Sequence, residues 1–291
     1  MKQHRVYSRE DYISLTSDLW TDSLNTVSNV SLTAHFVTGQ MSSTTLTVKN
    51  MDHTADNIST TIDEILQDWE VDNAKVMCCT TDGAANIVKA VEERFGKSRH
   101  LHCFVHILNL MATDCLKASE RATSLVSDVK GIVTFFKQSV RAMDRLRHEQ
   151  IKSGSSGAEI LKLVQEVSTR WNSTYYMLER YLKLHNCVVA VQMTLAGPDM
   201  IPKTKLDDMQ IMVSLLKPLE CVTREISTEK NVTTRKLVPL LRCLKIALGR
   251  CVVTNQFGTE FKKVILSKFD KRFGGIEGSK LIPWPHCWIH V

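Results

Sequence analysis

Three segments near the start of the chain have the apolar and polar patterning of strands. They lie at 13–20, 27–37 and 43–49, and in the second one apolar side chains occupy every second position from Val30 to Phe36. A period of two is typical of a strand that buries one face. Because only short polar turns separate the segments, the pattern predicts an antiparallel meander.

After residue 55 the pattern takes on the period of a helix and then alternates between strands and helices. An apolar stretch at 76–80 lacks alternation, which predicts a strand buried on both faces. A helix at 84–94 and a strand at 101–105 follow. The order β-β-β-α-β-α-β favours a mixed sheet in the layout of a ribonuclease-H-like α/β core. Apolar residues at helical spacing predict the first helix: Ile58, Ile62, Ile65, Leu66 and Trp69.

From residue 106 onward only helical periods are found. A switch to helices without a proline-rich linker favours a large all-helical insertion that packs on the core rather than a tethered domain. We therefore predict an α/β core at 1–110, an all-α insertion at 111–282 and a divergent tail at 283–291. The expected helices lie at 107–117, 122–147, 159–165, 173–185, 207–227, 236–253 and 259–269.

Composition narrows the class of protein. The 291 residues are 43% hydrophobic, which is ample for a core, and the formal net charge of +6 permits a phosphate-backbone partner without requiring one. No apolar run is long enough to span a bilayer and the start lacks an apolar signal core, so no membrane partner is expected. Nine cysteines without a framework spacing favour reduced thiols in a cytosolic or nuclear protein.

Two acidic residues carry the candidate chemistry. Asp82 follows the buried strand, at the position where open α/β sheets place ligands. It can hold a divalent cation there, or it can cap the helix that begins near Ala84, which is the commoner role for a bare Thr-Asp-Gly. Asp18 lies inside the first strand, where it is either an exposed edge residue or a costly buried carboxylate. Since the first and fourth strands are expected to be neighbours, the two carboxylates are predicted to face each other and to suit Mg²⁺ or Mn²⁺.

Six separate stretches resemble the transposase-derived domain of the hAT superfamily, in the branch of the zinc finger BED domain-containing proteins. The resemblance extends from about residue 15 to residue 281. Each motif alone is weak, but their order and spacing together are specific. The stretches lie at 18–22, 81–86, 102–110, 168–174, 219–227 and 272–274.

The resemblance implies roles for particular residues. Asp18 and Asp82 match two members of an Asp-Asp-Glu metal triad. Cys103 and His106 match a pair that shapes the site and contacts DNA in active relatives. His106 is equally well explained as a helix-start histidine with a satisfied hydrogen bond. Cys-x-x-His is only half a zinc site and no second pair at zinc-finger spacing follows, so no zinc is expected in this chain.

A second set of residues lies in the predicted insertion. Trp171 matches a residue that stacks on a distorted DNA end in active relatives, and its neighbours Arg170 and Asn172 suit contact with phosphate. Base stacking on an aromatic side chain contributes about 1–3 kcal/mol. The alternative is a core role, which is the more frequent one for a tryptophan at the start of a helix.

The chain also departs from the family pattern. The triad's glutamate lies beyond the insertion in the family, whereas the tail from Pro283 does not resemble the family sequence and Glu260 and Glu277 fall within the predicted insertion. The BED zinc finger and the dimerisation segment of the family are not found. We therefore expect a core that is incomplete at its C-terminus and a catalytically inactive, truncated and domesticated transposase-like protein.

The expected role is that of a nuclear DNA-associated or protein-interaction module of the transcription-regulator kind, and self-association is compatible with it. One alternative is an active Mg²⁺-dependent transposase or nuclease that uses Asp18 and Asp82. Another is a helical interaction scaffold that does not bind DNA. Five basic residues favour DNA contact, with steep salt dependence, unless they form a solvated helix face. They are Lys130, Lys137, Arg141, Arg145 and Arg147.

Overall fold

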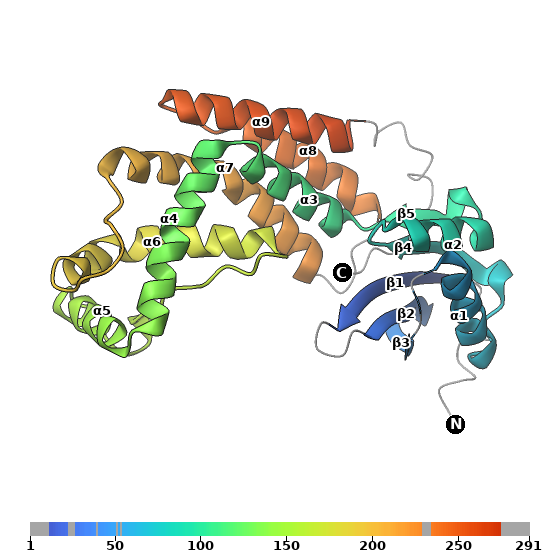
Figure 1. Cartoon of the computed structure of the whole chain (residues 1–291). Helices are drawn as coiled ribbons and strands as arrows, with labels where there is room; N and C mark the ends of the chain where they lie inside the picture. Colours follow the sequence, from blue (N-terminus) through green and yellow to red (C-terminus); the bar gives the residue numbers. More distant parts are fainter. Residues whose placement is uncertain are drawn as a thin grey trace. The chain divides into compact units, whose positions relative to one another are not determined.

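The described chain forms two compact units, whose helices and strands are labelled in Figure 1. The computed structural model describes residues 12–22, 27–38, 40–50, 52, 54–228 and 234–274. The first unit contains the described residues up to Ile107 and those of Arg224–Leu241. The second contains Leu108–Thr223 and Arg242–Gly274. The predicted tail at 283–291 lies outside the described residues, and the predicted domain boundaries stay a prediction.

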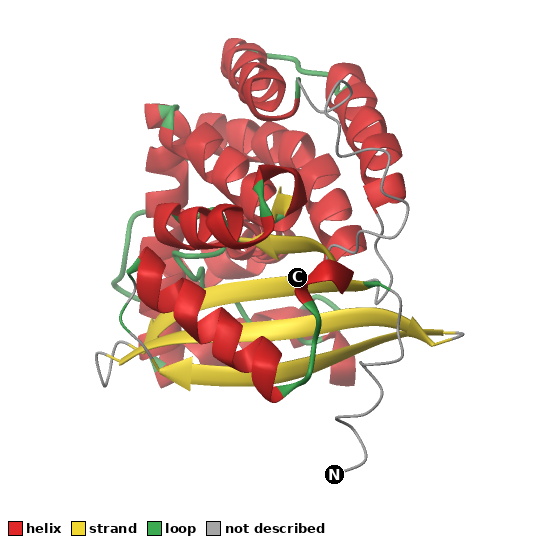
Figure 2. Ribbon diagram, turned by 90° about the vertical axis from the view of Figure 1, so that its right-hand side faces the viewer, coloured by secondary structure: helices red, strands yellow, loops and turns green. Residues whose placement is uncertain are grey.

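A five-stranded mixed sheet forms the centre of the first unit (Figure 2). Its order is β3-β2-β1-β4-β5, in which β1 pairs antiparallel with β2 and parallel with β4. This confirms the predicted meander followed by parallel strands and the ribonuclease-H-like α/β class. The strands are β1 (Ile13–Asp22), β2 (Val27–Thr38), β3 (Gln40–Asn50), β4 (Val76–Thr81) and β5 (His100–His102).

Two helices pack on one face of this sheet and complete its core. They are α1 (Ala55–Asp68) and α2 (Ala85–Phe95), and short 3₁₀ turns at Asn73–Lys75 (η2) and Lys97–Arg99 (η3) precede β4 and β5. The hydroxyl of Thr54 accepts a hydrogen bond from the Asn57 N–H and caps α1. One apolar cluster joins the sheet to both helices, and its central members include Leu15, Leu32, Ala34, Ile58, Ile62, Ile65, Cys79, Ile87 and Val91.

The fifth strand is shorter than the expected 101–105. The Cys103 N–H donates to the Thr81 carbonyl at 2.7 Å, which is the last bond between the two chain segments. The Cys103 carbonyl then accepts from the Ile107 N–H at 3.0 Å and opens the next helix. The sequence prediction is wrong here because Phe104 and Val105 belong to that helix and not to the strand.

The second unit is helical, as predicted. Its elements are α3 (Phe104–Lys117), α4 (Glu120–Gln138), α5 (Val140–Lys152), the 3₁₀ turn η4 (Gly157–Glu159), α6 (Trp171–Gln192), α7 (Lys203–Thr228), α8 (Thr234–Arg250) and α9 (Gln256–Phe273). The first residues of α3 and of α8 and the last residues of α7 belong to the first unit.

Two predicted helices of the second unit are wrong in detail. The single helix expected at 122–147 is interrupted at Ser139, whose hydroxyl accepts from the Ala142 N–H and caps α5. The helix expected at 159–165 is absent from the described structure, which has only η4 there. The buried Gln150 side chain bonds both the N–H and the carbonyl of Leu161 and so holds that segment in an extended conformation.

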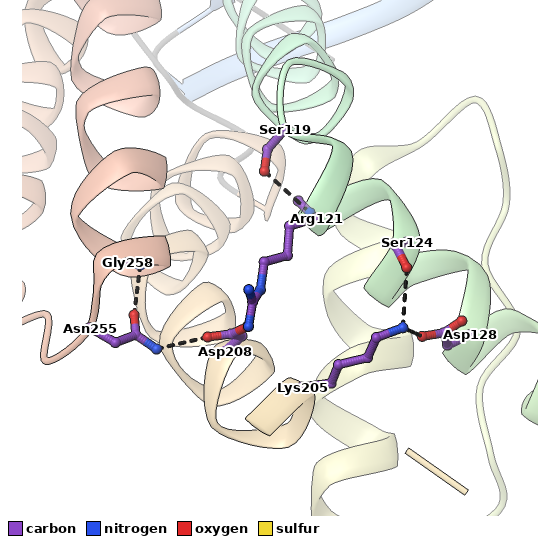
Figure 3. Close-up of polar contacts among 9 residues, drawn as sticks. Ser119, Arg121, Ser124, Asp128, Lys205, Asp208, Asn255 and Gly258 are labelled. Carbon is purple, nitrogen blue, oxygen red and sulfur yellow. Dashed lines mark hydrogen bonds and ion pairs between the residues drawn. The ribbon is translucent and has the colours of Figure 1, made fainter. Parts of the chain in front are cut away.

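A buried carboxylate ties three helices of the second unit together (Figure 3). Asp208 of α7 is 1% exposed; it forms a short ion pair with Arg121 of α4 and accepts a hydrogen bond of 2.7 Å from Asn255 Nδ2. Asn255 Oδ1 in turn accepts from the Gly258 N–H at 2.8 Å and caps α9. The positions of α4, α7 and α9 therefore depend on one charged side chain.

This network gives a prediction about stability. Asp208→Ala is expected to lower the free energy of unfolding by about 3 kcal/mol, because it leaves Arg121 and Asn255 without their shared acceptor. Asp128→Ala, which removes a more exposed partner of Lys205, is the control and is expected to cost less than about 1 kcal/mol. Urea unfolding followed by circular dichroism measures both values, and equal losses would contradict the central role of Asp208.

Candidate functional site

Asp18 lies on β1, and Asp82 directly follows the neighbouring parallel strand β4. Leu15 of β1 pairs with Cys79 of β4, and Thr16 pairs with Thr80. Continued in the same register, the two strands bring Asp18, two residues after Thr16, beside Asp82, two residues after Thr80. The predicted juxtaposition of the two carboxylates at one end of the sheet is therefore confirmed.

The two carboxylates interact electrostatically. The pKa of Asp18 is raised, first because its carboxylate is partly withdrawn from water and second because the negative charge of Asp82 repels its ionised form. The Leu19 backbone and the His106 ring lower the same pKa by smaller amounts. Asp18 as a whole is an exposed residue and Asp82 is half-buried. The site is thus open to solvent, and a cation would favour its fully ionised form.

A tight turn fixes Asp82. Its Oδ1 accepts a hydrogen bond of 3.1 Å from the Ala84 N–H, and Gly83 adopts a φ of 90°, which glycine tolerates best. The N-cap residue of α2 is Ala84, and no side chain caps that helix. Instead of capping α2, Asp82 is held in a local turn by the hydrogen bond from the Ala84 N–H.

Cys103 and His106 join the two aspartates at the start of α3. Burial raises the pKa of the half-buried Cys103 thiol, and the charges of Asp18 and Asp82 raise it further, while the backbone at His106 and Val105 lowers it. Cys103 is thus a neutral thiol at pH 7. The four predicted residues of the first unit are gathered at one place.

A buried hydrogen bond behind Asp82 was not predicted. Thr81 Oγ1 lies 2.9 Å from His100 Nε2 and accepts from the Gly83 N–H at 3.3 Å. Burial lowers the pKa of His100 to about 4, so its ring is neutral at pH 7 and is able to support the turn without adding charge. His102 stands at right angles to it, with ring centroids 4.7 Å apart. The His-x-His spacing before Cys103 is the only sequence signal for this arrangement.

The second predicted set lies in the other unit, at the start of α6. Trp171 is 3% exposed, its backbone N–H donates to Asn109 Oδ1 at 3.0 Å, and its buried indole N–H has no hydrogen-bond partner among the described residues. Trp171 is a core side chain here, so stacking on DNA requires it to leave this position. Arg170 is exposed and Asn172 is half-buried. Their roles in DNA contact stay a prediction.

The five basic residues predicted to favour DNA contact are distributed over α4 and α5. Lys130 pairs with Glu166 at 2.5 Å, and Arg145 bonds the Thr194 hydroxyl at 2.6 Å. The other three, Lys137, Arg141 and Arg147, are exposed and carry no ion pair within the part of the chain that is described. Two of the five are therefore engaged in holding the unit together.

Neither a metal-ligand cluster nor a membrane-spanning helix is found in the described part of the chain. No three His, Cys, Asp or Glu side chains among them are arranged to hold a metal ion. No described helix has the length and hydropathy needed to cross a bilayer.

The raised pKa of Asp18 predicts a pH-dependent effect on stability. Between the ordinary aspartate pKa of about 3.9 and the raised value, the folded chain binds more protons than the unfolded chain. Ionisation of Asp18 therefore lowers the free energy of unfolding as pH rises through this window. Asp18→Asn has no ionisable group at this position. Its free energy of unfolding in urea is therefore expected to equal that of wild type at pH 3 and to exceed it at pH 7.

An NMR titration of the Asp18 carboxyl carbon tests the cause. In Asp82→Asn the pKa of Asp18 is expected to fall part of the way toward its ordinary value, because repulsion is removed while burial, the larger cause, remains. An unchanged pKa would show that the two carboxylates do not interact.

The turn at Gly83 gives a second prediction for this site. An added Cβ would lie 3.0 Å from His102 Nδ1 and would stand at a left-handed φ. Gly83→Ala is expected to lower the free energy of unfolding by about 1–2 kcal/mol. Gly131→Ala is the matched control, since this helical glycine has open space around its Cβ position, and it is expected to raise stability by about 0.5–1 kcal/mol. Destabilisation by both changes would contradict the role of the turn.

Two family models match consecutive parts of the chain. Residues 16–106 match a family model described as the ZBED1 RNase-like domain, which contains the sheet and the Asp18–Asp82 pair. Residues 101–208 match one described as the ZBED1 RNase-like helical domain.

Curated relatives include transposases and regulators. The chain is 23% identical over 253 residues to Zinc finger BED domain-containing protein 4 of Homo sapiens, covering 83% of this chain and 21% of the relative. It is 30% identical over 142 residues to the Putative AC transposase of Zea mays, covering 43% of this chain and 16% of that protein. A Putative transcriptional regulator tpeD of Talaromyces stipitatus is 23% identical over 228 residues, covering 66% and 26%. The chain spans about a quarter or less of each relative, and it belongs to the hAT-transposase-derived family in its BED zinc finger branch.

Proposed function

We propose that this chain is the DNA-associated module of a nuclear, transcription-regulator-like protein and that it does not cleave DNA. The observation that carries the proposal is the Asp18–Asp82 pair, in which Asp18 lies inside β1 and Asp82 directly follows the neighbouring parallel strand β4. Two like charges in partial burial have a cost that a cation would remove. The pair therefore supports descent from a centre that cut phosphodiester bonds.

The described site offers few metal ligands, which supports a chain that binds DNA without cleaving it. Asp18 and Asp82 suit Mg²⁺ or Mn²⁺, but no third side chain among the described residues completes the group. When bound, such an ion supplies a polarised water and neutralises charge on a phosphodiester. Two carboxylates leave most of its coordination to water, so the described residues provide too few ligands to fix the water and the leaving oxygen in line.

Two other candidate functions each have one observation in their favour. An active Mg²⁺-dependent nuclease is favoured by the repulsion within the acidic pair, which a bound cation would relieve. A helical scaffold that does not bind DNA is favoured by the burial of Trp171. The nuclear location is supported by the relatives' names and by the cysteines within the described residues, which are all free thiols.

Cation binding at the pair is tested by thermal unfolding with and without millimolar Mn²⁺. Wild type is expected to gain stability from the ion, because the ionised carboxylates are no longer opposed. The gain is expected to disappear in Asp18→Asn and in Asp82→Asn, and to remain in the control Asp72→Asn, which lies before β4. An equal gain in all four proteins would show that the ion binds elsewhere.

Cleavage and binding of DNA separate the three functions. Wild type and Asp82→Ala are both expected to leave supercoiled plasmid intact in Mg²⁺ and in Mn²⁺. Nicking by wild type that Asp82→Ala abolishes would establish the nuclease instead. A shift of duplex DNA in a gel that weakens steeply between about 50 and 200 mM salt would support DNA association, whereas no shift at low salt would favour the scaffold.

A further inference from the structure

The positive charge of the chain is concentrated in one segment of the second unit. Between Arg242 and Gly274 the sequence has eight Lys or Arg and two acidic residues, so this segment has a formal net charge of +6, equal to that of the whole chain. The remaining residues contain 29 basic and 29 acidic side chains. The formal net charge of the rest of the chain is therefore zero.

The segment folds as an antiparallel pair formed by the end of α8 and the whole of α9 (Figure 1). Lys262 of α9 donates to the carbonyls of Gly249 and Cys251 at 2.7 and 2.8 Å, and Lys245 of α8 pairs with Asp270 at 2.7 Å. The later residues of α8 contact the earlier residues of α9 and the reverse, so the two helices are antiparallel. The pair is thus held as one unit by contacts of its own.

Its cations and its aromatic rings lie on different faces. The rings of α9 are buried, namely Phe257, Phe261, Phe269 and Phe273. The exposed cations are Arg242, Lys245, Arg250, Lys263 and Lys271. Among these, Arg250, Lys263 and Lys271 have no ion-pair partner among the described residues. Of the two acidic residues, Asp270 is already paired with Lys245.

We propose that the exposed cations of α8 and α9 form the surface that binds the phosphate backbone of duplex DNA. This inference rests on the proposed function and names the surface that performs it. A helix of 18 residues is about 27 Å long at 1.5 Å per residue, and B-DNA carries one negative charge per roughly 1.7 Å of its axis. Several phosphates are therefore within reach of one pass along α9.

The surface fits duplex DNA better than a single strand. Proteins that hold single strands combine cations with exposed aromatic platforms on which bases stack. All the aromatic rings of α9 point into the core instead. The exposed cations of α9 are two lysines, Lys263 and Lys271, and such point charges contact the backbone without reading base sequence.

The test compares two triple variants that remove equal charge. Arg250→Gln/Lys263→Gln/Lys271→Gln alters the α8–α9 surface, and Lys137→Gln/Arg141→Gln/Arg147→Gln alters exposed cations of α4 and α5. Affinity for a 20-base-pair duplex is measured by fluorescence anisotropy between 50 and 200 mM salt. The α8–α9 variant is expected to lose at least about tenfold in affinity at 100 mM, and its slope of log affinity against log salt to become shallower by roughly 2–3. The α4–α5 variant is expected to lose less than about threefold.

The other outcomes overturn either the proposed function or the assignment of the α8–α9 surface. If wild type fails to bind duplex at 50 mM salt, the proposed function itself fails. If wild type binds and both variants lose equal affinity, or the α8–α9 variant loses none, only this assignment fails. Circular dichroism checks the fold of each variant. If the triple change unfolds α9, the single change Lys263→Glu, at an exposed position in the middle of the helix, is measured instead, with Lys137→Glu as its control. Lys263→Glu is expected to lose more DNA affinity than Lys137→Glu. An equal loss of affinity in the two single variants would overturn the assignment.

Discussion

The parallel pairing of β1 with β4 is the constraint on which the first unit depends. It joins two strands that are separated by the whole meander and by α1. The parallel register places Asp18, inside β1, beside Asp82, which directly follows β4, so no contact between the two side chains is needed to bring them together. The same edge receives Cys103, whose N–H bonds the last residue of β4. The site is therefore a consequence of strand order rather than of local sequence.

Strand order and periodicity are also the properties that the sequence revealed. The alternation in β2 and the apolar stretch of β4 were sufficient to predict the mixed sheet and the meeting of Asp18 with Asp82. The break at Ser139 was not predictable in the same way, because two helices of similar apolar period give one continuous pattern. Likewise, Phe104 and Val105 favour a strand by composition, and only the hydrogen bonds of Cys103 commit them to a helix.

Parts of the site were hidden for a different reason. The bond between His100 and Thr81 joins side chains on adjacent strands whose register is set by the fold, so the His-x-His spacing alone does not reveal the partner of His100. Trp171 shows the opposite case, in which the sequence identified the residue but left two roles open. Its 3% exposure places it in the core of its unit. An aromatic residue at the start of a helix serves either as a core side chain or as a platform for a base. Its burial distinguishes these two roles, and that burial is known only once the neighbouring helices are placed.

The charges of the acidic pair and of the basic helices bear on where the proposed DNA affinity would originate. Asp18 and Asp82 repel phosphate, so without a cation they weaken rather than support DNA contact. The residues outside 242–274 have no formal excess of either charge, and several exposed cations elsewhere are neutralised, as Lys130 is by Glu166. Backbone binding requires counterion release by a local excess of positive charge. We propose that this excess lies on α8 and α9, so the proposed surface for DNA and the acidic pair reside on different elements and are able to change independently.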